Sequence, residues 1–144
     1  MKALDYFTEQ DKNLISNSVK DAENHTSGEI RVYLEDHCKG DVMDRAAFIF
    51  AELRMHKTEQ RNGVLIYLAL QEHKFAVLGD AGINAIVIPD FWNTVKELML
   101  EHFINGRYTD GLVAGITEAG KVLKAHFPFE KGDSNELSDE VVIG

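Results

Sequence analysis

An unbroken apolar run from Val64 to Leu70 constrains the fold more than any other part of this sequence. The run reads VLIYLAL, and strand-forming side chains without polar alternation are typical of a strand buried on both faces. A second, shorter apolar run follows at residues 75–78, and only the polar residues 71–74 separate the two. A connection of that length predicts a β-hairpin. The sequence therefore predicts a sheet that needs covering on both sides.

The open end of this hairpin combines polar and glycine residues. Counting back from a reversal at residues 71–74 places Asn62 and Gly63 beside Gly79 and Asp80. We call residues 61–63 and 79–84 the hairpin mouth. The polar residues before the first strand of the hairpin and the acidic, glycine-bearing residues after the second would meet there. We expect the functional site at this edge of the sheet.

Apolar spacing elsewhere predicts one more strand and four helices. Residues 29–35 alternate polar and apolar side chains, which is typical of a strand with one buried face. The helices are expected at residues 9–24 after the cap Thr8, 42–55 after the cap Asp41, about 90–104, and 110–126 after the cap Thr109. Residues 85–88 fit either a short strand or a helical turn. Helices interleaved with strands predict a three-layer α/β/α sandwich, an α/β fold with a small mixed sheet. Residues 29–35 and 63–70 should run parallel through the helix between them.

Length, net charge and the lengths of apolar runs limit the classes of protein to which this chain can belong. A chain of 144 residues suits one core; we predict a single domain over residues 1–128 and an acidic tail over 129–144, flexible or docked on the core. The net charge of −9 argues against nucleic acid and anionic membranes as partners. No apolar run approaches the roughly 20 residues of a membrane span, and the N-terminus lacks the apolar region of a secretory signal. We therefore expect a cytoplasmic protein without a membrane span.

The hairpin mouth is the strongest candidate for chemistry. Asp80 stands in a tight GDAG loop, and a carboxylate beside outward carbonyls is how Ca²⁺ or Mg²⁺ is held. Asn62 adds an amide oxygen, and Asp110 adds a carboxylate if its helix starts near the same edge. Asn84 or Asp90 would support such a site. The alternative is that Asp80 only forms a turn and Asp110 only assists a helix start.

Other chemistries have weaker support in the sequence. His37 and Cys38 are adjacent in a polar loop, where we expect them to be exposed to solvent and without catalytic function. The six histidines show no paired ligand spacing, so zinc is not expected. Neither a Walker sequence nor a dinucleotide GxGxxG motif occurs.

Four short motifs, in order, resemble the TPM-domain family, which is named from thylakoid-lumen phosphatase-like and photosystem II repair proteins. They are SGEIRV at 27–32, RNGVLI at 61–66, GDAGIN at 79–84 and GRYTDGL at 106–112. The resemblance spans Thr8 to Pro128, and the chain looks like the short, single-domain bacterial type.

The resemblance implies a Rossmann-like sandwich that binds divalent cations, mainly Ca²⁺, at acidic loops on one sheet edge. Some plant members are described as acid phosphatases. By position, the matching residues are Asn62, Asp80 and Asp110. Many relatives have an acidic residue where this chain has Arg61, and a glutamate where it has Asn84. Both departures weaken the phosphatase inference.

Three hypotheses follow. The first is a Ca²⁺- or Mg²⁺-binding module that orders loops or bridges to an unidentified protein partner. The second is a metal-dependent phosphatase acting on phosphomonoesters, for which Arg61 and Arg107 are the nearby phosphate-clamp candidates. The third is a scaffold domain whose acidic edge is only surface.

Overall fold

A mixed four-stranded sheet forms the centre of the computed structural model, which describes residues 3–129 and 141–144. Its strands are β1 (Glu29–Glu35), β2 (Gly63–Ala69), β3 (Lys74–Gly79) and β4 (Val142–Ile143), in the spatial order β3-β2-β1-β4. β1 runs parallel to both β2 and β4, and β2 pairs antiparallel with β3. The predicted hairpin and the predicted parallel pair are confirmed.

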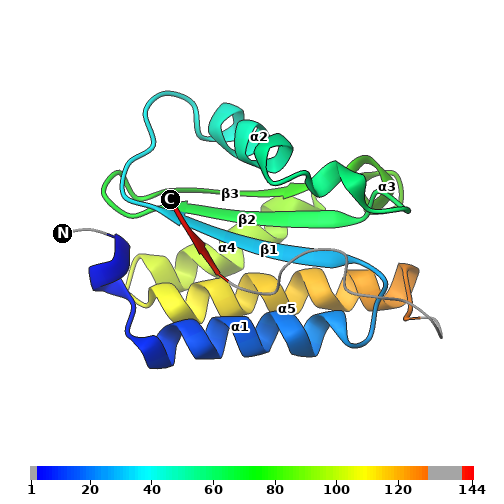
Figure 1. Ribbon diagram of the computed structural model, residues 1–144, viewed down its shortest axis with the longest axis horizontal. Coiled ribbons are helices and arrows are strands. Elements are labelled where there is room, and N and C mark those ends of the chain that lie inside the picture. The colour runs from blue at the N-terminus through cyan, green and yellow to red at the C-terminus, as the bar shows by residue number, and fades with distance from the viewer. Residues whose placement is uncertain (1–2, 130–140) are drawn as a thin grey trace.

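Helices cover both faces of this sheet (Figure 1). They are α1 (Glu9–Glu23), α2 (Val42–Glu52), the single turn α3 (Ala81–Asn84), α4 (Phe91–Phe103) and α5 (Tyr108–His126), with short 3₁₀ turns at Ala3–Tyr6 and Met55–Lys57. Helices α1, α4 and α5 lie on one face, and α2 lies on the other. The fold is therefore the predicted three-layer α/β/α sandwich. Across residues 3–129 and 141–144, no helix has both the length and the apolar character that crossing a membrane requires.

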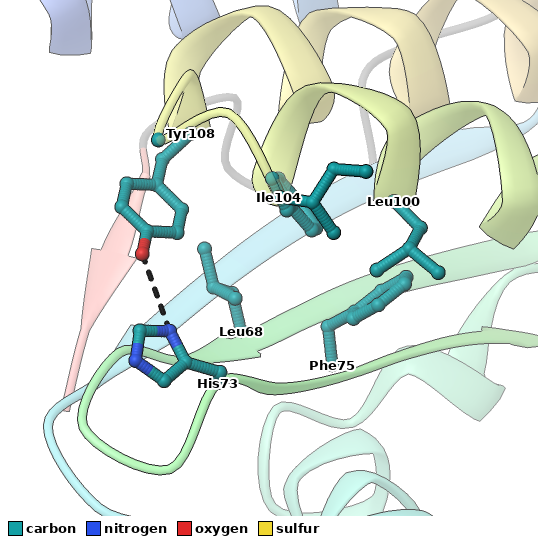
Figure 2. A pocket seen from close by; sticks show the side chains of 8 residues that line it. Leu68, His73, Phe75, Leu100, Ile104 and Tyr108 are labelled. Atoms are coloured by element: carbon teal, nitrogen blue, oxygen red, sulfur yellow. Dashed lines mark hydrogen bonds between the residues drawn. The ribbon is translucent and has the colours of Figure 1, made fainter.

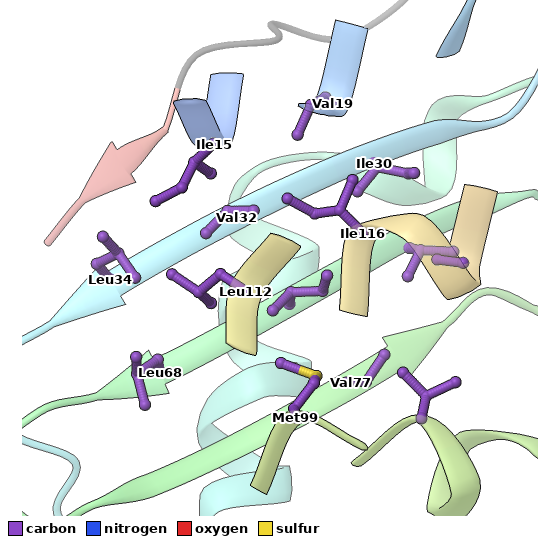
Figure 3. Close-up of a cluster of buried hydrophobic side chains, with 14 of the residues drawn as sticks. Ile15, Val19, Ile30, Val32, Leu34, Leu68, Val77, Met99, Leu112 and Ile116 are labelled. Atoms are coloured by element: carbon purple, nitrogen blue, oxygen red, sulfur yellow. The ribbon is translucent and has the colours of Figure 1, made fainter. Parts of the chain in front are cut away.

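The apolar run from Val64 to Leu70 is buried over its whole length, because alternate side chains of β2 enter opposite layers. Val64, Ile66 and Leu68 belong to the larger core, beneath α1, α4 and α5 (Figure 3). Leu65 and Tyr67 belong to the smaller core, beneath α2. One strand thus joins both cores, and no polar position interrupts it.

Local signals set the starts of α1 and α2. Thr8 and Asp11 form a reciprocal capping box in which both hydrogen bonds measure 3.0 Å. Asp41 likewise accepts a 3.0 Å hydrogen bond from the backbone amide of Asp44. The predicted cap Thr109 is wrong, since Tyr108 is already helical and the amide of Gly111 donates to the carbonyl of Arg107.

Two open alternatives are decided in the described residues. The ambiguous stretch at 85–88 is not a strand, because the chain turns helical at α3 and then continues as a turn into α4. At the C-terminus, Val142 and Ile143 pair with β1 and the amide of Gly144 donates to the carbonyl of Leu34. The end of the predicted tail is therefore docked, while residues 130–140 lie outside the described part of the chain.

Gly82 packs directly against the backbone of residues 60–61 at the hairpin mouth. Its amide donates to the carbonyl of Arg61 at 2.8 Å. A Cβ atom at this position would lie 2.0 Å from the carbonyl oxygen of Gln60. Because backbone rather than a flexible side chain occupies that space, only glycine fits without moving the chain.

Gly82→Ala should destabilise the fold by about 3 kcal/mol, because the added methyl group forces the backbone at residues 60–61 to shift. Urea unfolding measures this change in free energy. Gly106→Ala is the comparison: its φ is +73° but nothing lies within 4 Å of the new Cβ, so we expect only about 1 kcal/mol from the left-handed backbone. Equal losses in the two variants would contradict the close contact.

Candidate functional site

The hairpin mouth forms as the sequence predicted. Val64 pairs with Gly79 in the sheet register. The amide of Asp80 donates to the carbonyl of Gly63 at 2.9 Å. Asp80 therefore stands where β3 ends and α3 begins, directly beside the entry to β2.

Asp80 is the nearly buried carboxylate of this mouth, with 6% exposure. Its Oδ2 accepts from Nε of Arg61 at 2.7 Å, and its Oδ1 accepts from Nη2 of Arg61 at 2.8 Å. Oδ1 also accepts from the amide of Ala81 at 2.7 Å. The hydrogen bonds and charge of Asp80 raise the pKa of Arg61. Both carboxylate oxygens are thus held by a fork-shaped cation.

Arg61 enters this pair from the solvent side. Its side chain is 51% exposed, and its φ of +52° places the backbone in the left-handed region. The sequence marked Arg61 as a departure from the family pattern and as a candidate phosphate clamp, but it did not predict the pairing with Asp80. The signal was present: an arginine directly before the strand that neighbours Asp80.

Asn62 holds an unsatisfied polar atom. The residue is 1% exposed, and its Nδ2 donates to Oγ of Ser27 at 3.3 Å. Its backbone amide donates to Oγ1 of Thr58 at 3.1 Å. Its Oδ1 has no hydrogen-bond partner within the described residues. A buried acceptor in this state costs about 1–3 kcal/mol, and a water or a ligand would satisfy it.

Asn84 is engaged in a structural latch. Its Nδ2 donates to the carbonyl of Gly79 at 2.7 Å, and its Oδ1 accepts from Nε1 of Trp92 at 2.8 Å. The latch joins the end of β3 to the start of α4. Because both ends of the amide are used, this conformation does not offer Asn84 as a ligand. Asp90 is exposed at the start of α4, with Nδ2 of Asn93 at 3.4 Å from its Oδ1.

Asp110 lies at the other end of the sheet, so the predicted grouping of Asp110 with Asn62 and Asp80 is not formed. Helix α5 starts at Tyr108, whose hydroxyl is 3.2 Å from Nδ1 of His73 in the β2–β3 turn. Asp80 follows the opposite end of β3, roughly 20 Å away at the rise of an extended strand.

The placement of Asp110 has a topological cause. Helix α4 starts near the mouth, where Trp92 meets Asn84, and ends where Phe103 packs on Phe75. A short turn then starts α5 at that far end, and α5 returns toward the mouth. At the far end, in the first turn of α5, Asp110 lines an open depression of about 290 Å³ together with Asp11 and Tyr6.

The mouth only partly fits a divalent cation. Within residues 3–129 and 141–144, no three His, Cys, Asp or Glu side chains form a group suited to a metal ion. The oxygens at the mouth are Oδ1 of Asn62, which has no partner, and the carboxylate of Asp80, which is held by Arg61. A cation at Asp80 therefore requires Arg61 to withdraw.

A second polar cluster lies at the carboxyl ends of β1 and β2. Glu35 accepts hydrogen bonds from Arg45 and from the hydroxyl of Tyr67. Burial acts to raise the pKa of Glu35, but the hydrogen bonds from Arg45 and Tyr67 outweigh it and lower the pKa overall. Burial, and then the bond to Glu35, raise the pKa of Tyr67. This cluster stabilises the junction between the sheet and α2.

The loop after β1 is pinned to the hairpin turn. Glu72 accepts from the amide of Cys38 and contacts Nδ1 of His37, both at 3.0 Å. Cys38 is only 2% exposed, so the expectation that it faces solvent is wrong. The thiol packs in the smaller core because this loop folds back onto the sheet. His37 is exposed, as expected.

The fold and the two polar ends define an α/β/α sandwich domain built around one hairpin. The family model of the TPM domain matches residues 2–122, and the chain therefore belongs to the TPM-domain family, as its motifs predicted.

Solved structures agree with this assignment. The chain is 42% identical to the BA42 protein of the psychrophilic bacterium Bizionia argentinensis, covering 96% of this chain and 95% of that one, with a TM-score of 0.89. The N-terminal domain of the cg2496 protein from Corynebacterium glutamicum is 12% identical, covering 92% of this chain and 81% of that chain, with a TM-score of 0.66. The N-terminal domain of a P. gingivalis protein is 17% identical, covering 84% and 78%, with a TM-score of 0.61. The last two show the fold alone. The chain has no match among curated proteins.

Glu35→Gln should lower the free energy of unfolding by about 1 kcal/mol near neutral pH, because a charged hydrogen-bond acceptor is lost in a partly solvated pair. The lowered pKa of Glu35 means that this contribution is present above the ordinary glutamate pKa and is lost as pH falls through the folded-state pKa. Urea unfolding from about pH 7 to about pH 3 should therefore show the wild type and the variant converging. Glu118→Gln, which removes an exposed pair with Lys121, should cost no more than about 0.5 kcal/mol. A difference that persists at about pH 3 would contradict the assignment.

Asn84→Ala should destabilise the protein by about 1 kcal/mol, since it removes both bonds of the latch. Trp92 is the only tryptophan, so its fluorescence emission reports the lost bond directly and should shift to longer wavelength. Asn93→Ala, one residue along on α4 and exposed, is the matched control and should leave the emission unchanged. An unaltered spectrum in Asn84→Ala would argue against the latch.

Proposed function

We propose that this chain is a divalent-cation-binding module of the TPM type, with Ca²⁺ or Mg²⁺ as the ion and Asp80 as the principal ligand. One observation carries the proposal: Asp80 is a nearly buried carboxylate whose two oxygens are held by a positive charge from a half-exposed side chain. The position therefore requires a cation, and Arg61 supplies one from the solvent side.

Exchange of that cation is energetically accessible. A buried carboxylate left without a positive partner is strongly disfavoured, so Asp80 must be paired at all times. Arg61 can swing into water without leaving a hole in the core, because its side chain is half exposed. The guanidinium regains its hydration there, which offsets part of the cost of leaving Asp80. A divalent ion carries twice the charge and can compete for the same oxygens.

The available donors favour an ion that keeps part of its water shell. Ca²⁺ takes 6–8 oxygens, whereas Mg²⁺ is commonly bound by one or two carboxylates and several waters. Oδ1 of Asn62, which has no partner in the described chain, and the exposed Asp90 are the supplementary oxygens at this end. The net charge of −9 raises the local concentration of cations around the whole chain.

The phosphatase alternative stays a prediction that no specific contact favours. Arg61 is committed to Asp80, and Arg107 lines the depression around Asp110 at the far end of the sheet. Neither guanidinium is free beside Asp80 to clamp a phosphate. The protein partner and the cytoplasmic localisation also stay predictions.

Titration with CaCl₂ or MgCl₂, followed by amide chemical shifts, tests the proposal. We expect the first shifts at residues 60–63 and 79–84, together with a change in Trp92 fluorescence. Asp80→Asn should abolish them. Asp110→Asn is the matched control, since it removes the same charge from the opposite end of the sheet and should leave them intact.

Shifts that survive in Asp80→Asn, or that centre on Asp110, would refute the assignment of this site. Spectra that do not respond to either ion would remove the function itself. An aryl-phosphate assay on the same proteins separates a binder from an enzyme: turnover that is lost in Asp80→Asn would establish the phosphatase alternative.

A further inference from the structure

An apolar cavity lies far from Asp80, between the hairpin turn, α4 and the α4–α5 turn (Figure 2). Its volume is about 390 Å³. The labelled side chains that line it are Leu68, His73, Phe75, Leu100, Ile104 and Tyr108. We call it the α4–α5 cavity, and the proposed cation site does not use it.

Aromatic rings and exposed aliphatic side chains form its walls. Phe75 and Phe103 meet edge to face with centroids 4.9 Å apart, and Tyr108 lies 5.8 Å from Phe103. Leu100 and Ile104 complete the wall and remain 46% and 73% exposed. Apolar side chains that converge on a concavity and stay in contact with water favour an apolar ligand.

One hydrogen bond fixes the shape of this cavity. The hydroxyl of Tyr108 lies 3.2 Å from Nδ1 of His73 and joins the hairpin turn to the start of α5. Burial, and then the proximity of Tyr6, raise the pKa of Tyr108. The hydroxyl therefore stays protonated and can donate to the imidazole. Figure 2 shows this pair at one side of the cavity, with Leu100 and Phe75 at the other.

A polar depression that contains Lys96 adjoins the apolar cavity, because the two share Phe75 and Leu100. Nζ of Lys96 lies 5.9 Å from the centroid of the Phe75 ring, and Lys96 forms no ion pair within residues 3–129 and 141–144. Asn93 and Glu97 also line this depression. Lys96 is thus an ammonium without a close ion-pair partner in the described residues, although Glu97 lines the same depression, and its place beside an apolar cavity favours an anion with an apolar body.

We propose that the α4–α5 cavity binds a small aromatic monocarboxylate. Its ring system lies between Phe75 and the Leu100–Ile104 side, and its carboxylate meets the ammonium of Lys96. The cavity volume of about 390 Å³ falls in the range of small-molecule binding sites, and it suits a ligand with a single aromatic ring or two fused rings. It is too small to enclose a helix of a partner protein, whose diameter is about 10 Å.

Binding of 2-naphthoate, followed by amide chemical shifts of the full chain, tests the proposal. The shifts should be confined to the first half of β3, the last turns of α4 and the α4–α5 turn. Its neutral amide, 2-naphthamide, should bind about threefold more weakly, because it loses one partly exposed charge pair.

Two matched pairs of variants locate the ligand. Ile104→Ser should weaken binding about fivefold by removing apolar contact, whereas Ile88→Ser, whose side chain is similarly exposed at 70%, should not change it. Lys96→Gln should bind 2-naphthoate and 2-naphthamide equally, whereas Lys20→Gln should keep the preference for the carboxylate. All four positions are at least partly exposed, so the variants should fold, and their spectra confirm it.

Three outcomes would overturn the proposal. They are shifts that map outside the cavity, equal affinity of the wild type for 2-naphthoate and 2-naphthamide, and cavity resonances that move with protein concentration when no ligand is present. The last outcome would assign the surface to a second copy of the chain instead.

Discussion

Burial of β2 on both of its faces is the constraint on which the rest of the structure depends. Every residue of this strand is buried, and its side chains alternate between the two cores. A strand that is buried on both faces needs a helical layer on each side and a neighbouring strand at each edge. β1 and β3 are those neighbouring strands. Helices α1, α4 and α5 cover one face of the sheet, and α2 covers the other.

The two ends of the sheet have different characters. At the hairpin mouth, Asp80 and Arg61 form a close pair beside Oδ1 of Asn62, which has no hydrogen-bond partner in the part of the chain that the structure describes. At the far end, the α4–α5 cavity is walled by aromatic rings, with Lys96 nearby. The length of the sheet separates them, so a cation at one end and an organic anion at the other would not compete. This separation makes the two proposals independent.

Features encoded in consecutive residues were predictable. The boundaries of β1, the capping box of Thr8 and Asp11, and the neighbours at the hairpin mouth follow from side-chain alternation, short-range hydrogen bonding and loop length. The placement of Asp110 did not follow, because it depends on the direction in which α4 crosses the sheet. The buried position of Cys38 was missed as well, since only the contact of its loop with Glu72 folds it inward.

The sequence alone determined the three-layer sandwich and the meeting of Asn62 and Asp80 at one rim, because hydrophobic periodicity and a four-residue reversal act over short stretches of chain. Its four motifs, by their resemblance, also indicated the family that the family model shows. Only the tertiary structure decided which charges touch. It paired Asp80 with Arg61, which lies 19 positions away, and it assembled the α4–α5 cavity from a turn, a strand and two helices. Contacts of that kind depend on how whole elements pack against one another, and no local pattern of residues specifies that packing.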